Sequence, residues 1–311
     1  MKKIISFAVV FCICACLFAF VCEAASTSDA VEPIDASREC TLTLNYFNSE
    51  TTFADFDLAV YHVASVSADM QYTLTEAFAP TALVLNGIAS DSEWNTVRTT
   101  FESFTDAKHP EPAMQKTSAG GSVVFEGLTP GLYFVMPMSL DGNGILYYFD
   151  SALIAVPGLD ENGRWVYDVT ANPKPKANLS SDRDSYKVVK LWRDIGNEHK
   201  RPTEITVDIL RNGKTVKTVV LSAENNWTYS WDAANKTDRW QVAEKEVPDG
   251  YVVTVDKHNV TFSIVNADPD SPNPPPTGDT FEAGLYIALI CISGMALIIV
   301  GTAMKKRLGS R

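Results

Sequence analysis

Cysteine is scarce in this 311-residue sequence. Five of the six cysteines lie within two apolar stretches near the chain ends, and Cys40 alone lies between those stretches. A single thiol excludes an internal disulfide, which is the usual reinforcement of proteins that work outside the cell. If the chain is exported, its stability must come from another source.

Positive charge is scarce as well. The sequence has 26 Lys+Arg against 38 Asp+Glu, which gives a formal net charge of -12. Such acidity argues against nucleic acid or an anionic surface as a partner. The four histidines lack the spacing of metal ligands, so we expect neither a metal nor another cofactor.

The two chain ends predict export followed by attachment to a membrane. Residues 1–24 have a basic N-terminus, an apolar middle and small residues at the end, as in a signal peptide cleaved after Ala24. Lipoprotein cleavage near Cys14 is the alternative. Residues 285–304 are uncharged and long enough to form a transmembrane helix, and the basic segment 305–311 is typical of a cytoplasmic tail.

The residues between these ends favour an all-β protein. Short segments of alternating polarity are separated by Gly- and Asn-containing turns, which is the pattern of immunoglobulin-like β-sandwiches. Segments with proline and no apolar periodicity divide the chain. The predicted layout is a first β-sandwich domain at 38–173, a linker at 174–185, a second β-sandwich domain at 186–267 and a Pro-rich spacer at 268–280.

One segment of the first domain has a different period. Ser90 and Glu93 have the spacing of a capping box at the start of a helix. Apolar residues then recur at helical intervals, from Trp94 through Val97 and Phe101 to Phe104. We therefore expect one amphipathic helix inserted between strands.

Strand alternation places three polar side chains on apolar faces of the second domain. Lys190 is in phase with the apolar residues of the first strand, Glu244 with those of a middle strand and Asn266 with those of the last strand. Either Lys190 extends to solvent and the other two mark strand ends, or the three form a buried cluster. Burial would favour a neutral Lys190 amine and a protonated Glu244. The amine would then be a nucleophile, and the acid would hydrogen-bond the Asn266 carbonyl and transfer protons to departing ammonia.

The span from Tyr186 to Asn266 resembles a collagen-adhesin B-type (Cna B-type) domain of Gram-positive surface proteins. The resemblance is carried by the segments VVKLWRD and WQVAEKEVPDGY. The resemblance implies an autocatalytic isopeptide bond between Lys190 and Asn266. It also implies that Glu244, within the box Trp240–Tyr251, is the catalytic residue that promotes the bond.

The first domain resembles the N-terminal domain of sortase-assembled pilins through the segments GSVVFEGLTPGLYFV and FDLAVYHV. Its end, WVYDVTANPK, has the spacing of the pilin motif, with Trp165, Val169, Pro173 and Lys174 in place. The resemblance implies that Lys174 accepts the C-terminus of the next subunit. Lys176 is the competing acceptor, and a solvated linker lysine without a role is the other alternative.

The first domain departs from this family pattern at the cross-link positions. Its strand Cys40 to Tyr46 contains no lysine, and Pro137 stands where the glutamate of the box would lie. We therefore expect no Lys–Asn cross-link of the same geometry there.

The segment Pro274, Pro275, Pro276, Thr277 and Gly278, followed by an apolar run and a basic tail, resembles a sortase sorting signal of the L-P-x-T-G type. Proline replaces the usual leucine. The resemblance implies cleavage between Thr277 and Gly278 by a sortase, and then a bond to an amine of another pilin subunit or of peptidoglycan.

Together these features predict a pilin subunit, more specifically a shaft subunit, that is a sortase substrate and no enzyme beyond its own cross-linking. The expected location is a membrane-tethered precursor and then the cell wall or pilus of a Gram-positive cell. One alternative is a wall-anchored ancillary pilin or adhesin whose first domain binds a host ligand. Another is a eukaryotic single-span glycoprotein, since four asparagines open glycosylation sequons: Asn178, Asn226, Asn235 and Asn259.

Overall fold

The computed structural model describes the middle of the chain, which comprises residues 32–47, 52, 55–137, 147–174, 176–177, 184–233 and 238–271. These residues belong to one compact unit. The predicted signal peptide, sorting motif, transmembrane segment and tail lie outside the described residues. Within the described ranges, no helix has the length and apolar character needed to cross a bilayer.

The described part of the chain is mostly β-structure, as expected, and its N-terminal half contains two main sheets. The first has the order β11-β1-β5 and consists of β1 (Cys40–Asn45), β5 (Ser122–Leu128) and β11 (Asp168–Ala171). The second has the order β3-β2-β6-β8, with β4 also paired to β2, and consists of β2 (Asp57–Val66), β3 (Tyr72–Leu74), β4 (Met114–Thr117), β6 (Gly131–Pro137) and β8 (Ala152–Val156). We call these two sheets the N-terminal sheets.

The two N-terminal sheets face one another across an apolar core. Alternate residues of β1, such as Leu42 and Leu44, pack against Val60 of β2 and Phe125 of β5. Cys40 joins this core with 1 % of its surface exposed, and burial raises the pKa of its thiol to about 11. The one cysteine between the apolar ends is therefore a buried and unreactive thiol.

The predicted helix is α1 (Asp91–Lys108). Ser90 is its N-cap: the Ser90 hydroxyl accepts from the Glu93 amide, and the Glu93 carboxylate accepts from the Ser90 amide at 2.8 Å. Val97 and Phe101 pack on the outer face of the β2–β6 sheet. The capping box and the apolar period are thus confirmed.

The C-terminal half, residues 184–267, contains two further sheets, which we call the C-terminal sandwich. One has the order β16-β13-β19-β18 and consists of β13 (Asp184–Arg193), β16 (Thr228–Ala233), β18 (Val252–His258) and β19 (Thr261–Ala267). The other has the order β15-β14-β17 and consists of β14 (Glu204–Arg211), β15 (Lys214–Ser222) and β17 (Trp240–Glu244). A separate core that includes Val188, Val207 and Phe262 lies between them.

Short elements complete the described chain. They are the strand pair β7 (Tyr147–Tyr148) and β12 (Lys176–Ala177), the pair β9 (Gly158–Leu159) and β10 (Trp165–Val166), and three 3-10 turns at η1 (Ala79–Thr81), η2 (Glu198–Lys200) and η3 (Ala223–Asn225). The turn between β14 and β15 uses Asn212 and Gly213, both with positive φ, which these two residues adopt at little cost.

Two details correct the sequence analysis. The predicted linker 174–185 is partly strand, because Lys176 pairs with Tyr148 of β7 and β13 already begins at Asp184. Proline is compatible with extended backbone at a sheet edge, so Pro-containing sequence did not prevent this pairing. The motif segment WVYDVTANPK also does not form one continuous strand, since it contains the two separate strands β10 and β11.

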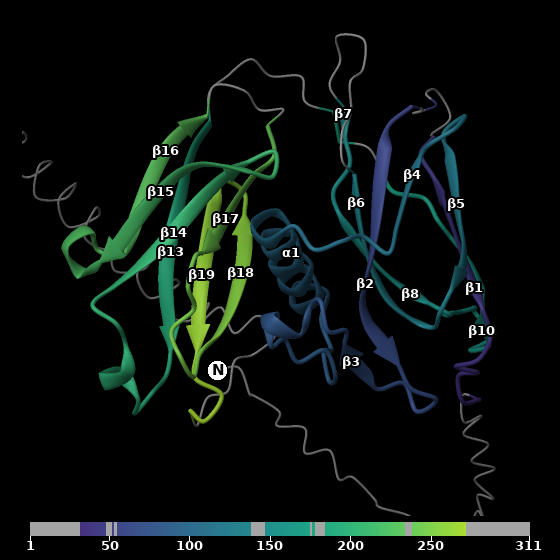
Figure 1. The fold of residues 1–311 in the computed structure, drawn as a ribbon, viewed down its shortest axis with the longest axis horizontal. Helices are drawn as coiled ribbons and strands as arrows, with labels where there is room; N and C mark the ends of the chain where they lie inside the picture. Colours follow the sequence, from purple (N-terminus) through teal and green to yellow (C-terminus); the bar gives the residue numbers. More distant parts are fainter. Residues whose placement is uncertain are drawn as a thin grey trace, which may run out of the picture. The chain divides into compact units, whose positions relative to one another are not determined.

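Helix α1 contacts both halves of the described chain. Its apolar side covers the β2–β6 sheet, and its other side contacts β17 and β18, the edge strands of the two sheets of the C-terminal sandwich (Figure 1). All five residues of β17 are consequently buried, including Gln241 and Ala243, which point away from the sandwich core. The helix therefore protects two strand edges that would otherwise be open.

Candidate isopeptide site

The site is built from three strands of the C-terminal sandwich. Lys190 lies on β13 and Asn266 on β19, and these strands are parallel neighbours in which Lys190 is opposite Ile264. Asn266 is two residues beyond Ile264, so its side chain points to the same face as Lys190. Both side chains therefore project into the core between the sheets.

Glu244 reaches the same region from the facing sheet. It is the last residue of β17, and the Asn266 Nδ2 group donates a hydrogen bond to its Oε1 at 2.9 Å. Only 3 % of Lys190, 7 % of Glu244 and 0 % of Asn266 is exposed. The alternative in which Lys190 extends to solvent is therefore wrong, and the three residues are buried as the cluster hypothesis required.

The polar atoms of the cluster are only partly satisfied. The Lys190 Nζ donates to the Leu191 carbonyl at 2.8 Å and lies 3.9 Å from the centroid of the Trp192 ring. The Glu244 Oε2 and the Asn266 Oδ1 have no hydrogen-bond partner among the described residues. Two unpaired acceptors in a core are costly, so this arrangement favours a further change of protonation or bonding.

Burial shifts both titratable groups toward their neutral forms. It lowers the pKa of Lys190 to about 7, against the opposing attraction of the Glu244 and Asp194 carboxylates. It also raises the pKa of Glu244, against the opposing effects of the Lys190 charge and the Asn266 hydrogen bond. A neutral amine and a protonated acid are the forms that amide exchange requires.

One expectation about the geometry needs correction. The sequence analysis expected Glu244 to bond the carbonyl of Asn266, whereas the structure has Glu244 accepting from the amide nitrogen. A carboxyl oxygen without a proton accepts hydrogen bonds in either charge state of the group, and the Nδ2 group is the donor of the asparagine side chain.

A second polar group, missed from the sequence, supports the site from one side. Asp194 is fully buried, forms an ion pair with Arg201 and accepts a hydrogen bond from the Tyr251 hydroxyl at 2.8 Å. The Tyr251 ring meets the Trp192 ring edge-on, with centroids 5.2 Å apart. These contacts fix the aromatic ring on which the Lys190 amine lies. The segment Trp192-Arg-Asp194 was a signal for them, since a carboxylate follows an apolar strand there.

The proposed acceptor region lies at the end of the N-terminal sheets. Trp165 is in β10, and its indole donates to the Glu32 carbonyl at 2.5 Å; Val169 is in β11, which pairs in parallel with β1. Pro173 is half-buried and Lys174 is exposed. Thr277, Gly278 and the three preceding prolines lie outside the described residues.

The family match with known proteins lies in the C-terminal sandwich. Residues 186–267 match the family model of the Cna protein B-type domain. The collagen adhesin of Staphylococcus aureus is 36% identical over 97 residues, which is 28% of this chain and only 8% of the adhesin. All three residues of the buried cluster lie within the span matched by the family model.

Solved structures also align with this chain. A single B repeat unit of the collagen binding surface protein of Staphylococcus aureus aligns with 16% identity over 76% of this chain and 99% of that chain, at a TM-score of 0.27. The major pilin SpaA of Corynebacterium diphtheriae aligns with 16% identity over 76% of this chain and 65% of that chain, at a TM-score of 0.31.

Proposed function

We propose that this chain, which carries a Cna protein B-type domain over residues 186–267, is a structural shaft pilin of a Gram-positive cell surface. In this proposal a sortase joins Thr277 of one copy to Lys174 of the next, and an internal Lys190–Asn266 bond reinforces the C-terminal sandwich. The observation that carries the proposal is the burial of Lys190, Glu244 and Asn266 together inside the matched span.

The internal bond forms by exchange of one amide for another. The neutral Lys190 Nζ attacks the Cγ of Asn266, the bond from Cγ to Nδ2 breaks and ammonia leaves. Glu244 takes a proton from the attacking amine and gives one to the departing nitrogen, so the reaction needs no oxidant, metal or other reactant. The fold supplies the proximity that makes an otherwise very slow reaction feasible.

The observed hydrogen bond suits the second half of this exchange. Asn266 Nδ2 already donates to Glu244 Oε1, so the carboxyl group lies next to the leaving nitrogen. A half-turn of the Asn266 amide would instead bring its unpaired Oδ1 against the protonated acid. That contact would polarise the carbonyl for attack by Lys190.

Polymerisation uses Thr277, which lies outside the described residues, and Lys174, which lies between the N-terminal sheets and the C-terminal sandwich. A sortase thiol attacks the Thr277 carbonyl, residues 278–311 leave, and the Lys174 amine of another copy displaces the thiolate. The exposure of Lys174 supports an acceptor role, and the fixed φ of Pro173 restricts how far the backbone before it can fold back. If peptidoglycan provides the final amine, the fibre is anchored to the wall.

The internal bond is tested by intact mass. The full chain should be one ammonia lighter than its sequence, and Glu244→Gln, which keeps the shape but cannot shuttle protons, should have the full mass. Peptide mapping of the lighter species should join the peptides that contain Lys190 and Asn266. An unshifted mass in the unmodified chain would exclude the bond.

The polymer is tested on wall extracts boiled in detergent. The unmodified chain should give a ladder of covalent multimers, and Lys174→Ala should reduce it to monomer while Thr277 still anchors the protein to the wall. The matched control is Lys176→Ala, which should leave the ladder unchanged. If Lys176→Ala abolishes the ladder and Lys174→Ala does not, the acceptor is Lys176.

The second candidate is a wall-anchored adhesin whose N-terminal sheets bind a host ligand. The 36% identity of 97 residues to a collagen adhesin favours it. A wall extract that contains only monomer, together with binding of the purified chain to a host matrix protein, would support this alternative over the shaft pilin.

A further inference from the structure

Helix α1 has a second buried face that its apolar period does not explain. Beside Val97 and Phe101, which pack on the N-terminal sheets, the helix buries a set of polar side chains: Thr99, Thr100, Glu102, Ser103, Thr105 and Asp106. Polar groups are buried only where partners compensate their desolvation. For four members of this set, the partners include residues of the C-terminal half: Thr100, Glu102, Ser103 and Asp106.

Two hydroxyl groups of α1 bond the backbone of the exposed strand edges. Ser103 Oγ donates to the Val242 carbonyl of β17 at 2.6 Å. Thr100 Oγ1 accepts from the Val255 amide of β18 at 3.0 Å, and its one hydroxyl hydrogen is shared between the Thr96 carbonyl of α1 at 2.8 Å and the Val255 carbonyl at 3.3 Å. The helix thus satisfies backbone groups that a further strand would satisfy in a wider sheet.

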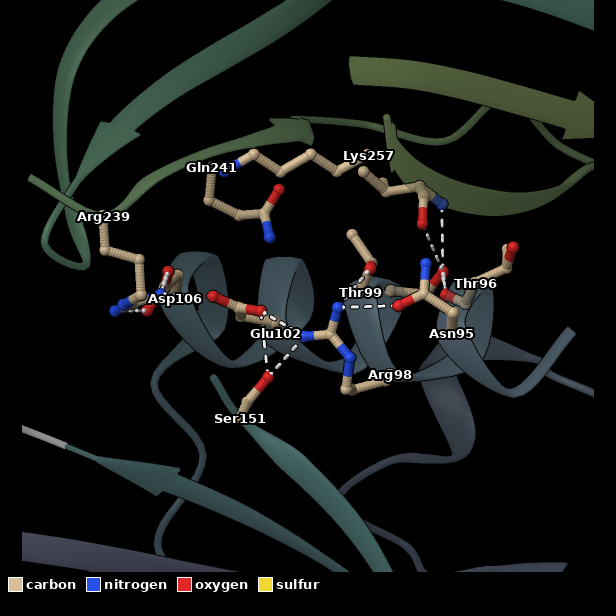
Figure 2. Close-up of polar contacts among 12 residues, drawn as sticks. Asn95, Thr96, Arg98, Thr99, Glu102, Asp106, Ser151, Arg239, Gln241 and Lys257 are labelled. Carbon is tan, nitrogen blue, oxygen red and sulfur yellow. Dashed lines mark hydrogen bonds and ion pairs between the residues drawn. The ribbon is translucent and has the colours of Figure 1, made fainter. Parts of the chain in front are cut away.

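An ion cluster fixes the start of β17 to the same helix (Figure 2). Arg239, the residue before β17, donates to both carboxylate oxygens of Asp106 and to Glu102 Oε1 at 3.2 Å. Glu102 also accepts from Arg98 at 3.1 Å and from Ser151 at 3.0 Å. Although burial opposes ionisation, the Arg239 and Arg98 charges hold the pKa of Glu102 below its ordinary value.

These contacts converge on the strand that ends in Glu244. Within the sheets, β17 pairs only with β14, so α1 supports its other side. Arg239 is fixed just before the strand, and the Val242 carbonyl is fixed two residues before Glu244. The 2.9 Å contact between Glu244 and Asn266 joins facing sheets, so it depends on where β17 lies relative to β19.

We infer that Arg239 and Ser103 are positioning residues for Glu244, so that the Lys190–Asn266 bond forms only after α1 has docked on β17 and β18. This inference rests on the proposed internal bond. It adds an order of events: the N-terminal sheets and α1 must be folded before the C-terminal sandwich is cross-linked. A subunit with an incomplete N-terminal half would remain without its bond.

The experiment refolds full chain that is recovered unfolded from inclusion bodies, in which Lys190 and Asn266 have not yet reacted, and follows the loss of ammonia by intact mass against time. Arg239→Gln and Ser103→Ala should each slow the reaction by about tenfold or more, because a small displacement of a catalytic group has large effects on rate. Arg98→Gln is the matched control, since Arg98 also bonds Glu102 but its other hydrogen-bond partners, Ser151, Asn95 and Thr99, all lie in the N-terminal half. The rate of this variant should stay within about twofold of the unmodified rate. Arg239→Lys should recover part of the rate.

A second readout separates this inference from the proposed bond. Amide hydrogen exchange at Val242, Ala243 and Glu244 should become faster in Arg239→Gln and stay unchanged in Arg98→Gln. If the unmodified chain never loses ammonia, the proposed bond fails, and the exchange data alone decide whether α1 holds β17. Folded Arg239→Gln and Ser103→Ala variants that react at the unmodified rate, or that show unmodified exchange, would overturn the inference.

Discussion

Burial changes the charge state of Lys190 from its state in water. Because burial lowers its pKa to about 7, the folded chain binds fewer protons at this residue than the unfolded chain over the pH range from about 7 to the ordinary value of 10.5. Folding stability therefore rises with pH across that window, and the full penalty of burying the ammonium ion is present below it. Glu244 acts in the opposite direction, because its raised pKa makes the folded chain bind more protons above 4.5.

This difference can be measured in a chain that cannot cross-link. In Glu244→Gln the acid is removed, so the Lys190 contribution stands alone. The free energy of unfolding of this variant should increase between pH 7 and pH 10, and urea titrations at each pH measure it. The double variant Glu244→Gln/Lys190→Met should lack the increase. Equal slopes in the two variants would mean that Lys190 is not titrating in the core.

The bond itself should also depend on pH. Refolding at pH 5 leaves only about 1% of an amine with a pKa near 7 in its neutral form, so ammonia loss should be slow there and should accelerate toward pH 7. Burial raises the pKa of Glu244, and loss of its proton should lower the rate again. Quenched samples analysed by intact mass give the profile. A rate that is flat from pH 5 to pH 8 would contradict the assigned roles.

At the scale of single elements, α1 depends on its first turn. Ser90→Ala removes the hydroxyl that accepts from the Glu93 amide and breaks the reciprocal capping box, which should destabilise the protein by about 1 kcal/mol. The control is Ser92→Ala, which changes an exposed serine two residues further along the chain and should alter stability by less than about 0.5 kcal/mol. Chemical denaturation of both variants checks the difference.

The elements also show what sequence reasoning can and cannot find. The faces of β13 and β19 were predictable, because apolar and polar side chains alternate along strands that have one buried face. The burial of Gln241 and Ala243 on β17 was not, because the cover comes from a helix that is 140 residues earlier in the chain.

The polar face of α1 was missed for a related reason. Its residues looked solvated, since only Trp94, Val97, Phe101 and Phe104 follow the apolar period. One signal was present, however: the segment TTFESFTD is rich in short hydroxyl side chains instead of the lysines and glutamates that usually cover a solvated face. Short hydroxyls can approach a backbone edge closely, as Ser103 does at Val242.

At the scale of the whole molecule, the proposed bond should separate the stabilities of the two halves. A cross-link that closes a loop of about 76 residues stabilises by about 4 to 5 kcal/mol in the loop-closure model. For a unit of this size, that corresponds to a rise in melting temperature of roughly 20 °C or more. No equivalent bond is expected in the N-terminal sheets.

Calorimetry should therefore show the N-terminal sheets melting first and the C-terminal sandwich well above them. In Glu244→Gln the upper transition should move down toward the lower one. Near-ultraviolet circular dichroism, recorded over the same temperatures, identifies the upper transition because four tryptophans lie in the C-terminal sandwich: Trp192, Trp227, Trp231 and Trp240. A single transition at the same temperature in both chains would contradict the assignment.

The parallel pairing of β13 and β19 has a mechanical consequence in the proposed fibre. Tension would enter each subunit at Lys174, just before β13 begins, and leave toward Thr277, just after β19 ends. Parallel neighbours pulled from opposite ends are loaded in shear, so their hydrogen bonds must yield together instead of opening one at a time. A Lys190–Asn266 bond would carry the load directly from one strand to the other. The N-terminal sheets precede Lys174, so apart from the β7–β12 pair they lie outside the covalent path between Lys174 and Thr277 and would carry little of the load.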